Sequence, residues 1–286
     1  MVAVGGLLFG LTRQAPALPT PQPPTSRAPG GQTPTSSGPR VGVNCANDTA
    51  RDTTSLAAAI HATPSGGTVV IAAGTCALTA HLPVSTAITI TGAGATSTFL
   101  VQHASANIFQ ITAPGVTVEN LNLDTATFNP GPGVLKNPKP GTLFSNSSHT
   151  TIRNVNSESG SGFGMRITGP NPCDAYPTQG TVVDNVNVTN TGHGGFTALD
   201  IDCTNGAVLT NITVHGDYIA FFKDENVTLH GENYTPDAKL CQAPWYITGP
   251  SSNITIDAVT SAGGRGISKG PSQNVALTNQ TASAGC

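Results

Sequence analysis

The sequence predicts an all-β solenoid, in which one chain coils so that short strands stack in parallel from turn to turn. A strand-like pattern returns at spacings of 20 to 34 residues, which leaves no room for crossover helices. Charged residues make up only 9% of the 286 residues, which argues against disorder or long solvated helices in most of the chain. Aromatic residues make up only 5%, so the hydrophobic core must consist mainly of Val, Ile, Leu and Ala. Such a composition suits strands.

Seven copies of the repeat place an alternating apolar strand before a bend residue, usually Asn. Strict alternation indicates a strand with one buried face, and Asn favours a bend because its side chain bonds to nearby backbone. Stacked coils would bring these amides into a ladder with a step of about 4.8 Å. A two-layer sandwich is the alternative, although hairpin signals are few. The bend positions are Asn120, Asn154, Asn185, Asn211, Gly231, Ala258 and Asn279.

Residues 1–43 are predicted to be an apolar start followed by a disordered linker, and residues 44–286 to be one domain. The apolar stretch 2–11 is shorter than the ~20 residues that span a bilayer. It fits the end of a secretory signal, with Ala15-Pro16-Ala17 as a cleavage site, or part of a tether to a membrane or cell surface. Residues 14–40 hold eight of the 22 prolines and should stay extended. We therefore expect a secreted or cell-surface protein.

Charge and cysteine content narrow the classes of partner. The net charge is −3, and it is −6 after residue 43, so the phosphate-neutralising stripe of a nucleic-acid-binding protein is absent. The six cysteines form neither CxxC pairs nor zinc-type Cys/His spacings, which favours disulfides in an oxidising compartment. The favoured pairing is Cys45 with Cys76 and Cys173 with Cys203, leaving Cys241 and Cys286. The oligomeric state is left open.

The start of the domain resembles a known family. Asp52-Thr53-Thr54, the helical-looking segment 55–62, Gly66-Gly67 with its following strand and the Gly92-Ala-Gly94 turn are similar to the cap and first coils of the pectin-lyase-like superfamily. The resemblance covers about residues 44–286. It implies a right-handed parallel β-helix with a short N-terminal capping helix, and a polysaccharide as partner. Because this fold carries hydrolases, lyases, epimerases, adhesins and tailspikes, the site must decide the activity.

The strand before each bend should present its outward residues as columns. One column is Gln110, Leu143, Arg166, Asp200, Phe221 and Tyr246, and the next is Thr112, Ser145, Thr168, Asp202, Lys223 and Thr248. Charge gathers at Arg166, Asp200, Asp202 and Lys223, and in so uncharged a chain this patch is the predicted functional site. A salt-bridged solvated face is the alternative interpretation.

Asp200, Asp202, His193 and Lys223 are the predicted catalytic residues. Strand positions i and i+2 have Cα atoms about 6.6 Å apart, which suits the two carboxyls of an inverting glycoside hydrolase. Alternatively the pair holds Ca²⁺, while Lys223, Arg166 or His193 abstracts a proton in a lyase. His193 lies in a Gly-rich turn and resembles the accessory histidine of polygalacturonases, but their Asn-Thr-Asp, Asp-Asp and Arg-Ile-Lys motifs are missing.

The predicted substrate-binding residues surround this pair. Trp245 and Tyr246 offer aromatic faces to a sugar ring, and a core role for Trp245 is the alternative. Asp217 lies in a turn that borders the groove, while Arg265-Gly-Ile-Ser-Lys269 loosely echoes the basic polygalacturonase motif. The predicted substrate-binding set is Arg166, Tyr246, Trp245, Asp217, Arg265 and Lys269.

These observations favour an exported enzyme that cleaves a polysaccharide in a groove along the solenoid, as a glycoside hydrolase or a lyase. Ca²⁺ is the only cofactor that the residues suggest. A non-catalytic, glycan-binding or tailspike-like solenoid and a polysaccharide epimerase are the competing hypotheses.

Overall fold

The computed structural model describes residues 38–126, 141–160, 163–169, 178–190, 197–236, 243–264, 266–269 and 271–283. The chain divides into Met1–Thr35 and Ser36–Cys286, and only the second unit contains described residues. The predicted apolar start and most of the linker therefore lie outside the described part. Arg40–Val43, which were predicted to lie in the linker, form strand β1 and pair with the next strand.

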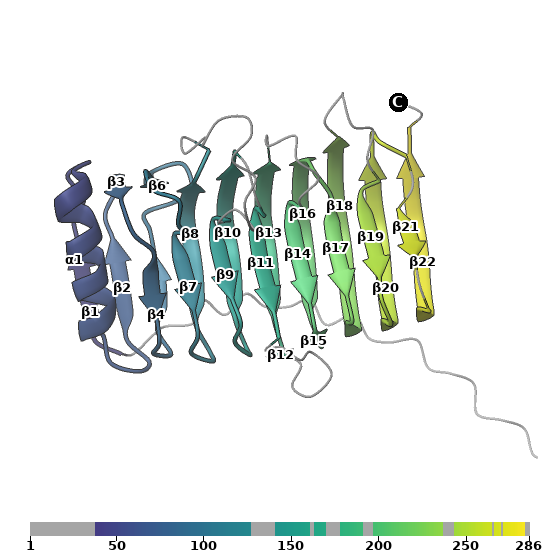
Figure 1. The fold of residues 1–286 in the computed structure, drawn as a ribbon, viewed down its shortest axis with the longest axis horizontal. Helices are drawn as coiled ribbons and strands as arrows, with labels where there is room; N and C mark the ends of the chain where they lie inside the picture. Colours follow the sequence, from purple (N-terminus) through teal and green to yellow (C-terminus); the bar gives the residue numbers. More distant parts are fainter. Residues whose placement is uncertain are drawn as a thin grey trace, which may run out of the picture. The chain divides into compact units, whose positions relative to one another are not determined.

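A single helix, α1 (Thr49–Ala62), precedes the first complete coil in the described chain. It begins six residues before the predicted segment because Asp48 caps it, accepting hydrogen bonds from the backbone N–H groups of Ala50 and Arg51. Its buried face contains Leu56, and the helix packs against β1, β3 and β4 at one end of the strand stack (Figure 1). The predicted N-terminal cap is confirmed.

The strands form two sheets in which every described pairing is parallel (Figure 1). The first sheet contains β1 (Arg40–Val43), β2 (Thr68–Ile71), β3 (Gly74–Leu78), β5 (Thr89–Thr91), β6 (Thr98–Gln102), β8 (Thr117–Asp124), β10 (Thr151–Ser159), β12 (Thr178–Gln179), β13 (Val182–Asn190), β15 (Thr204–Asn205), β16 (Val208–Gly216), β18 (Glu225–Pro236), β20 (Ser252–Ser261) and β22 (Gln273–Ala282). The second contains β4 (Leu82–Val84), β7 (Phe109–Ile111), β9 (Leu143–Ser145), β11 (Met165–Thr168), β14 (Leu199–Asp202), β17 (Ile219–Phe222), β19 (Trp245–Thr248) and β21 (Ile267–Lys269).

Equivalent residues of successive coils are vertical neighbours. Ile152 pairs with Val118 on one side and Val183 on the other, and all three side chains are fully buried. The same register continues through Leu209 and Leu229. Such columns of aliphatic side chains fill the space between the sheets, as the composition predicted. The predicted solenoid is confirmed, and the sandwich alternative is wrong because its antiparallel pairings do not occur among the described strands.

All seven predicted bend positions have a left-handed backbone, with φ between 50° and 76°. Asn tolerates this conformation better than other residues with a Cβ, which explains why the repeat favours it. Asn154 donates to the Asn120 side chain at 3.1 Å and accepts from Asn185 at 2.8 Å, so the predicted amide ladder forms among these three residues. Asn211 and Asn279 donate to Asp184 and Asp257 instead. A second ladder was not predicted. It links Asn205, Asn226, Asn253 and Asn274 through bonds of 2.9 to 3.0 Å.

The first predicted disulfide is present. Cys45 and Cys76 are bonded, with Cα atoms 4.8 Å apart, and they tie the segment before α1 to β3. Cys203 is also disulfide-bonded. Cys173, Cys241 and Cys286 lie outside the described residues, so the predicted pairing of Cys173 with Cys203 stays a prediction.

Candidate functional site

The outward face of the second sheet carries the predicted charged patch. Arg166 of β11 is the register partner of Asp200 on β14, as predicted. The column extends to Phe144 and Gln110 in one direction and to Ala220 and Tyr246 in the other.

Some predicted column members are wrong by one residue. Leu143, Ser145 and Phe221 point inward and are fully buried. Asp202 is the register partner of Phe222, and Lys223 follows the end of β17 with a φ of 56°. The predicted pairing of Asp202 with Lys223 is therefore corrected. Alternation could not identify the inward residue of β17, because Phe221 and Phe222 are adjacent and both apolar.

Arg166 contacts both carboxyl groups of β14. Its Nη2 donates to Asp202 Oδ2 at 2.6 Å, and its Nε lies 3.0 Å from Asp200 Oδ2 without hydrogen-bond alignment. Both Asp side chains are buried, whereas 32% of the Arg166 side chain is exposed. The Arg166 guanidinium also lies 4.9 Å from the centre of the Phe163 ring. Arg166 is thus fixed by three groups, and the patch is a coupled cluster rather than a solvated face.

Asp200 of β14 has a raised pKa. Burial, the nearby Asp202 charge and a hydrogen bond with Asp202 raise the pKa of Asp200 to about 8, although Arg166 opposes the rise. Asp200 therefore holds a proton at neutral pH, where an exposed Asp would have lost it. A protonated Asp200 beside a second carboxyl supplies a proton donor at this point of the surface.

The two carboxyls lie closer together than the Cα spacing of strand positions i and i+2 predicts. Asp200 and Asp202 share a hydrogen bond, so their carboxyls lie closer together than the roughly 6.5–9.5 Å of inverting glycosidases or the about 5–5.5 Å of retaining ones. The Cα spacing predicted a wider separation of the two carboxyls, because it does not account for side-chain direction. Both carboxyls point toward Arg166.

Two tyrosines lie on the other side of the pair from Arg166. Tyr246 is half-buried on the outward face of β19, and its ring centre is 4.4 Å from that of Tyr218. Burial raises the pKa of Tyr218, and the charges of Asp217, Tyr246 and Asp200 raise it further, so this ring belongs to the same cluster. Tyr218 is not among the predicted site residues, although it directly precedes β17 and follows Asp217, a predicted substrate-binding residue.

Trp245 does not fit its predicted role as a sugar platform. Only 1% of it is exposed, and it belongs to the core. A Cβ added at Gly266 would approach its ring to 1.9 Å, so Gly266 allows the final coil to pack on the indole. The core interpretation of Trp245 is correct. Asp217 is likewise buried.

Three predicted residues stay untested. His193 and Arg265 lie outside the described residues, and only the backbone of Lys269 is described, at the end of β21. Ca²⁺ binding also stays untested. Within the described ranges, no three His, Cys, Asp or Glu side chains converge as metal ligands.

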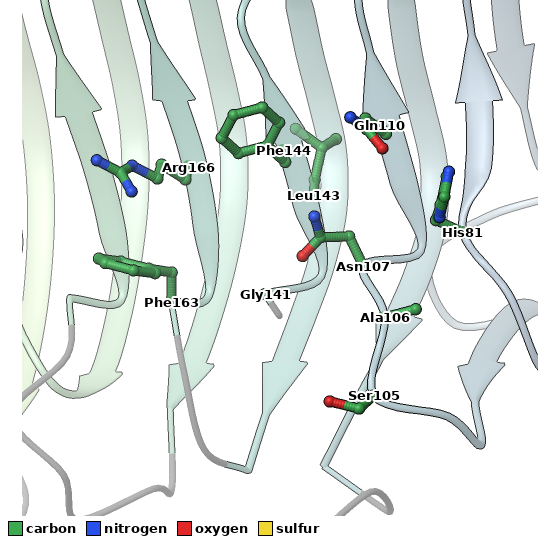
Figure 2. A pocket seen from close by; sticks show the side chains of 10 residues that line it. All are labelled: His81, Ser105, Ala106, Asn107, Gln110, Gly141, Leu143, Phe144, Phe163 and Arg166. Carbon is green, nitrogen blue, oxygen red and sulfur yellow. The ribbon is translucent and has the colours of Figure 1, made fainter. Parts of the chain in front are cut away.

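A pocket of about 470 Å³ lies beside Arg166 on the same face (Figure 2). Arg166 and Phe163 stand at one end and His81 at the other, with Phe144, Asn107 and Gln110 between them. The volume falls within the usual range for small-molecule sites. The pocket residues come from four successive coils, which sequence reasoning did not combine because only Gln110, Leu143 and Arg166 of its lining lie in the predicted columns.

Fold and site together define a parallel β-helix with a charged cluster and a pocket on one outward face. Three solved structures share this architecture. ORF18 of Geobacillus virus E2 has 13% identity and a TM-score of 0.56, over 85% of this chain and 60% of its own. The Dettilon tailspike protein has 11% identity and a TM-score of 0.55, over 79% and 46%. Rice weevil pectin methyl esterase has 13% identity and a TM-score of 0.53, over 82% and 86%.

These similarities establish the fold. The chain is a right-handed parallel β-helix, as the resemblance to the pectin-lyase-like superfamily implied. It spans 60% of the viral protein and under half of the tailspike. No protein-family model matches the sequence, and no curated protein matches it.

Proposed function

We propose that this protein is an exported carbohydrate-active enzyme that hydrolyses a glycosidic bond of a polysaccharide bound along the second sheet. The observation that carries the proposal is the carboxyl pair of β14, in which burial and Asp202 raise the pKa of Asp200 to about 8. A carboxylic acid that keeps its proton at neutral pH is the group that glycoside hydrolysis needs for its leaving oxygen.

In this mechanism Asp200 is the general acid and Asp202 the general base. Asp200 gives its proton to the glycosidic oxygen as the bond from that oxygen to the anomeric carbon breaks. Asp202 takes a proton from a water molecule, whose oxygen bonds to the same carbon. Exchange with solvent then returns a proton to Asp200 and removes one from Asp202. Because the two carboxyls touch in the free protein, the entering sugar must separate Asp200 from Asp202.

Arg166 and the aromatic residues have supporting roles. Arg166 holds the Asp202 carboxyl through a 2.6 Å contact and so fixes its position for its task as a base. Aromatic side chains lie on both sides of the pair along the column, Phe144 two strands before Asp200 and Tyr246 two strands after it. Their placement suits a polymer that extends across the pair in both directions.

Elimination is the second candidate, and the close contact within the pair favours it. In a syn elimination, one group abstracts a proton and its neighbour protonates the leaving oxygen on the same face of the sugar. Asp202 and Asp200 are near enough to do both. Two further alternatives involve no cleavage: glycan adhesion, as in a tailspike-like protein, and epimerisation.

The disulfide-bonded cysteines support the proposal that the protein is exported. Cys45–Cys76 and the bonded Cys203 suit an oxidising compartment, where a polysaccharide substrate is also accessible. No helix in the described ranges has the length and apolar character to cross a bilayer.

A polysaccharide screen tests the function. Reducing ends report hydrolysis, ultraviolet absorbance reports the unsaturated uronate of elimination, and a chelator tests for Ca²⁺. Asp200→Asn and Asp202→Asn should each lower the rate by about 10² or more while circular dichroism stays unchanged. Asp257→Asn, on the opposite sheet, is the matched control. Full activity in both β14 variants would remove the pair from the mechanism, and binding without cleavage would favour adhesion.

A further inference from the structure

The pocket beside Arg166 has a distinctive chemical lining. Two aromatic rings, Phe144 and Phe163, are half-buried at one side, and the amides of Asn107 and Gln110 face the same space (Figure 2). His81 and Ser105 complete the polar groups. Aromatic faces pack on the C–H faces of pyranose rings, while amides both donate to and accept from hydroxyl groups.

The pocket has little charge to offer an anionic ligand. Among its described lining residues there is no carboxylate, and Arg166 is the only permanently charged side chain. That charge is already engaged, since Arg166 lies 2.6 Å from Asp202 Oδ2 and 3.0 Å from Asp200 Oδ2. A uronate entering here would have to compete with Asp202 for the guanidinium and would be repelled by the Asp202 charge.

We infer that this pocket is a binding subsite for a neutral sugar residue, and that the polymer cleaved at Asp200 and Asp202 is neutral where it lies between Arg166 and His81. The inference rests on the proposed function and adds the substrate class. Elimination needs a carboxylate next to the abstracted proton to acidify it. A polymer that is neutral at the cleaved bond as well would therefore fit hydrolysis.

Binding by the full-length Asp200→Asn protein separates this inference from catalysis. Asn resembles the neutral carboxyl of Asp200, so the Arg166 contacts should persist while turnover stops. The probes are neutral hexasaccharides of β-1,4-linked mannose, xylose and galactose, and anionic hexasaccharides of galacturonate and mannuronate. Titration calorimetry is performed at low and high NaCl concentration.

At least one neutral hexasaccharide should bind, and its affinity should change less than about twofold with salt, because no ion pair forms. Adding Phe144→Ala should weaken that binding about tenfold, the equivalent of one lost aromatic contact. Val208→Ala is the control, because Val208 is an exposed apolar residue on β16 in the other sheet. Thermal melts verify that each variant is folded, and the salt test requires no pocket variant.

Preferred binding of a uronate hexasaccharide, with an affinity that falls steeply with salt, would overturn the inference. Binding of no probe in the millimolar range would also overturn it. These outcomes are distinct from failure of the proposed function. Cleavage of a polyuronate would refute the neutral subsite and leave Asp200 and Asp202 as the catalytic pair. Binding of a neutral hexasaccharide without cleavage in the unmodified protein would support the neutral subsite and refute the proposed hydrolysis.

Discussion

Arg166 and Asp202 lie diagonally across two neighbouring strands, with Nη2 of the arginine 2.6 Å from Oδ2 of the aspartate. Asp200, rather than Asp202, is the direct register partner of Arg166. One guanidinium therefore serves two carboxyls from a single strand, and a proton held between Asp200 and Asp202 lowers the repulsion that would otherwise separate them. The protonation of this pair is the property that the first two predictions use.

The rate of polysaccharide cleavage should have an alkaline limit set by Asp200. With a pKa of about 8, Asp200 is the active acid below this pH and loses its proton above it. We expect kcat/KM to fall about tenfold per pH unit beyond pH 8. Initial rates across about pH 3 to 10 measure the limit. A decline centred near the ordinary pKa of an aspartic acid would show that Asp200 is not the acid.

Substituting Arg166 should move that limit. The positive charge of Arg166 opposes the rise in the pKa of Asp200, so Arg166→Gln should raise this pKa further and shift the alkaline limit upward, while the maximal rate falls. Arg166→Lys is the matched control. It keeps the charge but cannot contact both carboxyls in the same way, so its limit should stay near that of the parent although its rate falls. Identical pH profiles for all three proteins would contradict the coupling.

The solenoid could be predicted from the sequence because the residue that sets each bend is determined locally and recurs in every coil. Each bend must adopt a left-handed backbone, and Asn or Gly at regular positions reveals it without knowledge of the tertiary structure. Arg166 and Asp200 could be matched for the same reason. Their strands have clean alternation, so aligning the repeats also aligns the outward side chains.

The remaining details of the site depend on information that a repeat does not carry. Phe221 and Phe222 are both apolar, so alternation could not show which one faces inward. The contact between the carboxyls of Asp200 and Asp202 depends on side-chain torsions rather than on strand spacing. The pocket combines side chains from segments such as Asn107 and Phe163 that lie just outside the regular strands.

Glu232 should destabilise the protein at neutral pH. It occupies an inward position of β18 between Ile212 and Val259, it is 1% exposed, and neither carboxyl oxygen has a hydrogen-bond partner. Burial raises its pKa well above the usual range, so the folded protein binds a proton there that the unfolded chain releases. The free energy of unfolding therefore falls as pH rises above the ordinary pKa of glutamate, and it keeps falling until the raised pKa is passed.

Glu232→Leu should relieve this cost. We expect the free energy of unfolding to rise by about 1–4 kcal/mol at pH 8, and by less at about pH 3, where both the folded and the unfolded state hold the proton. Urea unfolding at the two pH values measures the difference. Glu225→Leu, at an exposed position on the same strand, should change stability by less than about 0.5 kcal/mol at either pH. A destabilised Glu232→Leu at pH 8 would indicate that the carboxyl is satisfied in the folded protein.

The ladder at Asn154 stabilises the coils by two separable effects. Its backbone has a φ of 52°, and its side chain joins those of Asn120 and Asn185. Asn154→Ala loses the hydrogen bonds and also places an ordinary Cβ in a left-handed bend, so we expect a loss of about 2–3 kcal/mol. Asn154→Gly loses the same bonds without that strain and should lose about 1 kcal/mol less than Ala.

Asn233→Ala is the control for composition, because Asn233 is an exposed residue of β18 outside the left-handed positions. It should change the free energy of unfolding by less than about 0.5 kcal/mol. Urea midpoints for the three variants rank the effects. If Asn154→Gly proved less stable than Asn154→Ala, backbone strain would not be the reason that Asn recurs at these bends, and the side-chain ladder alone would have to explain the repeat.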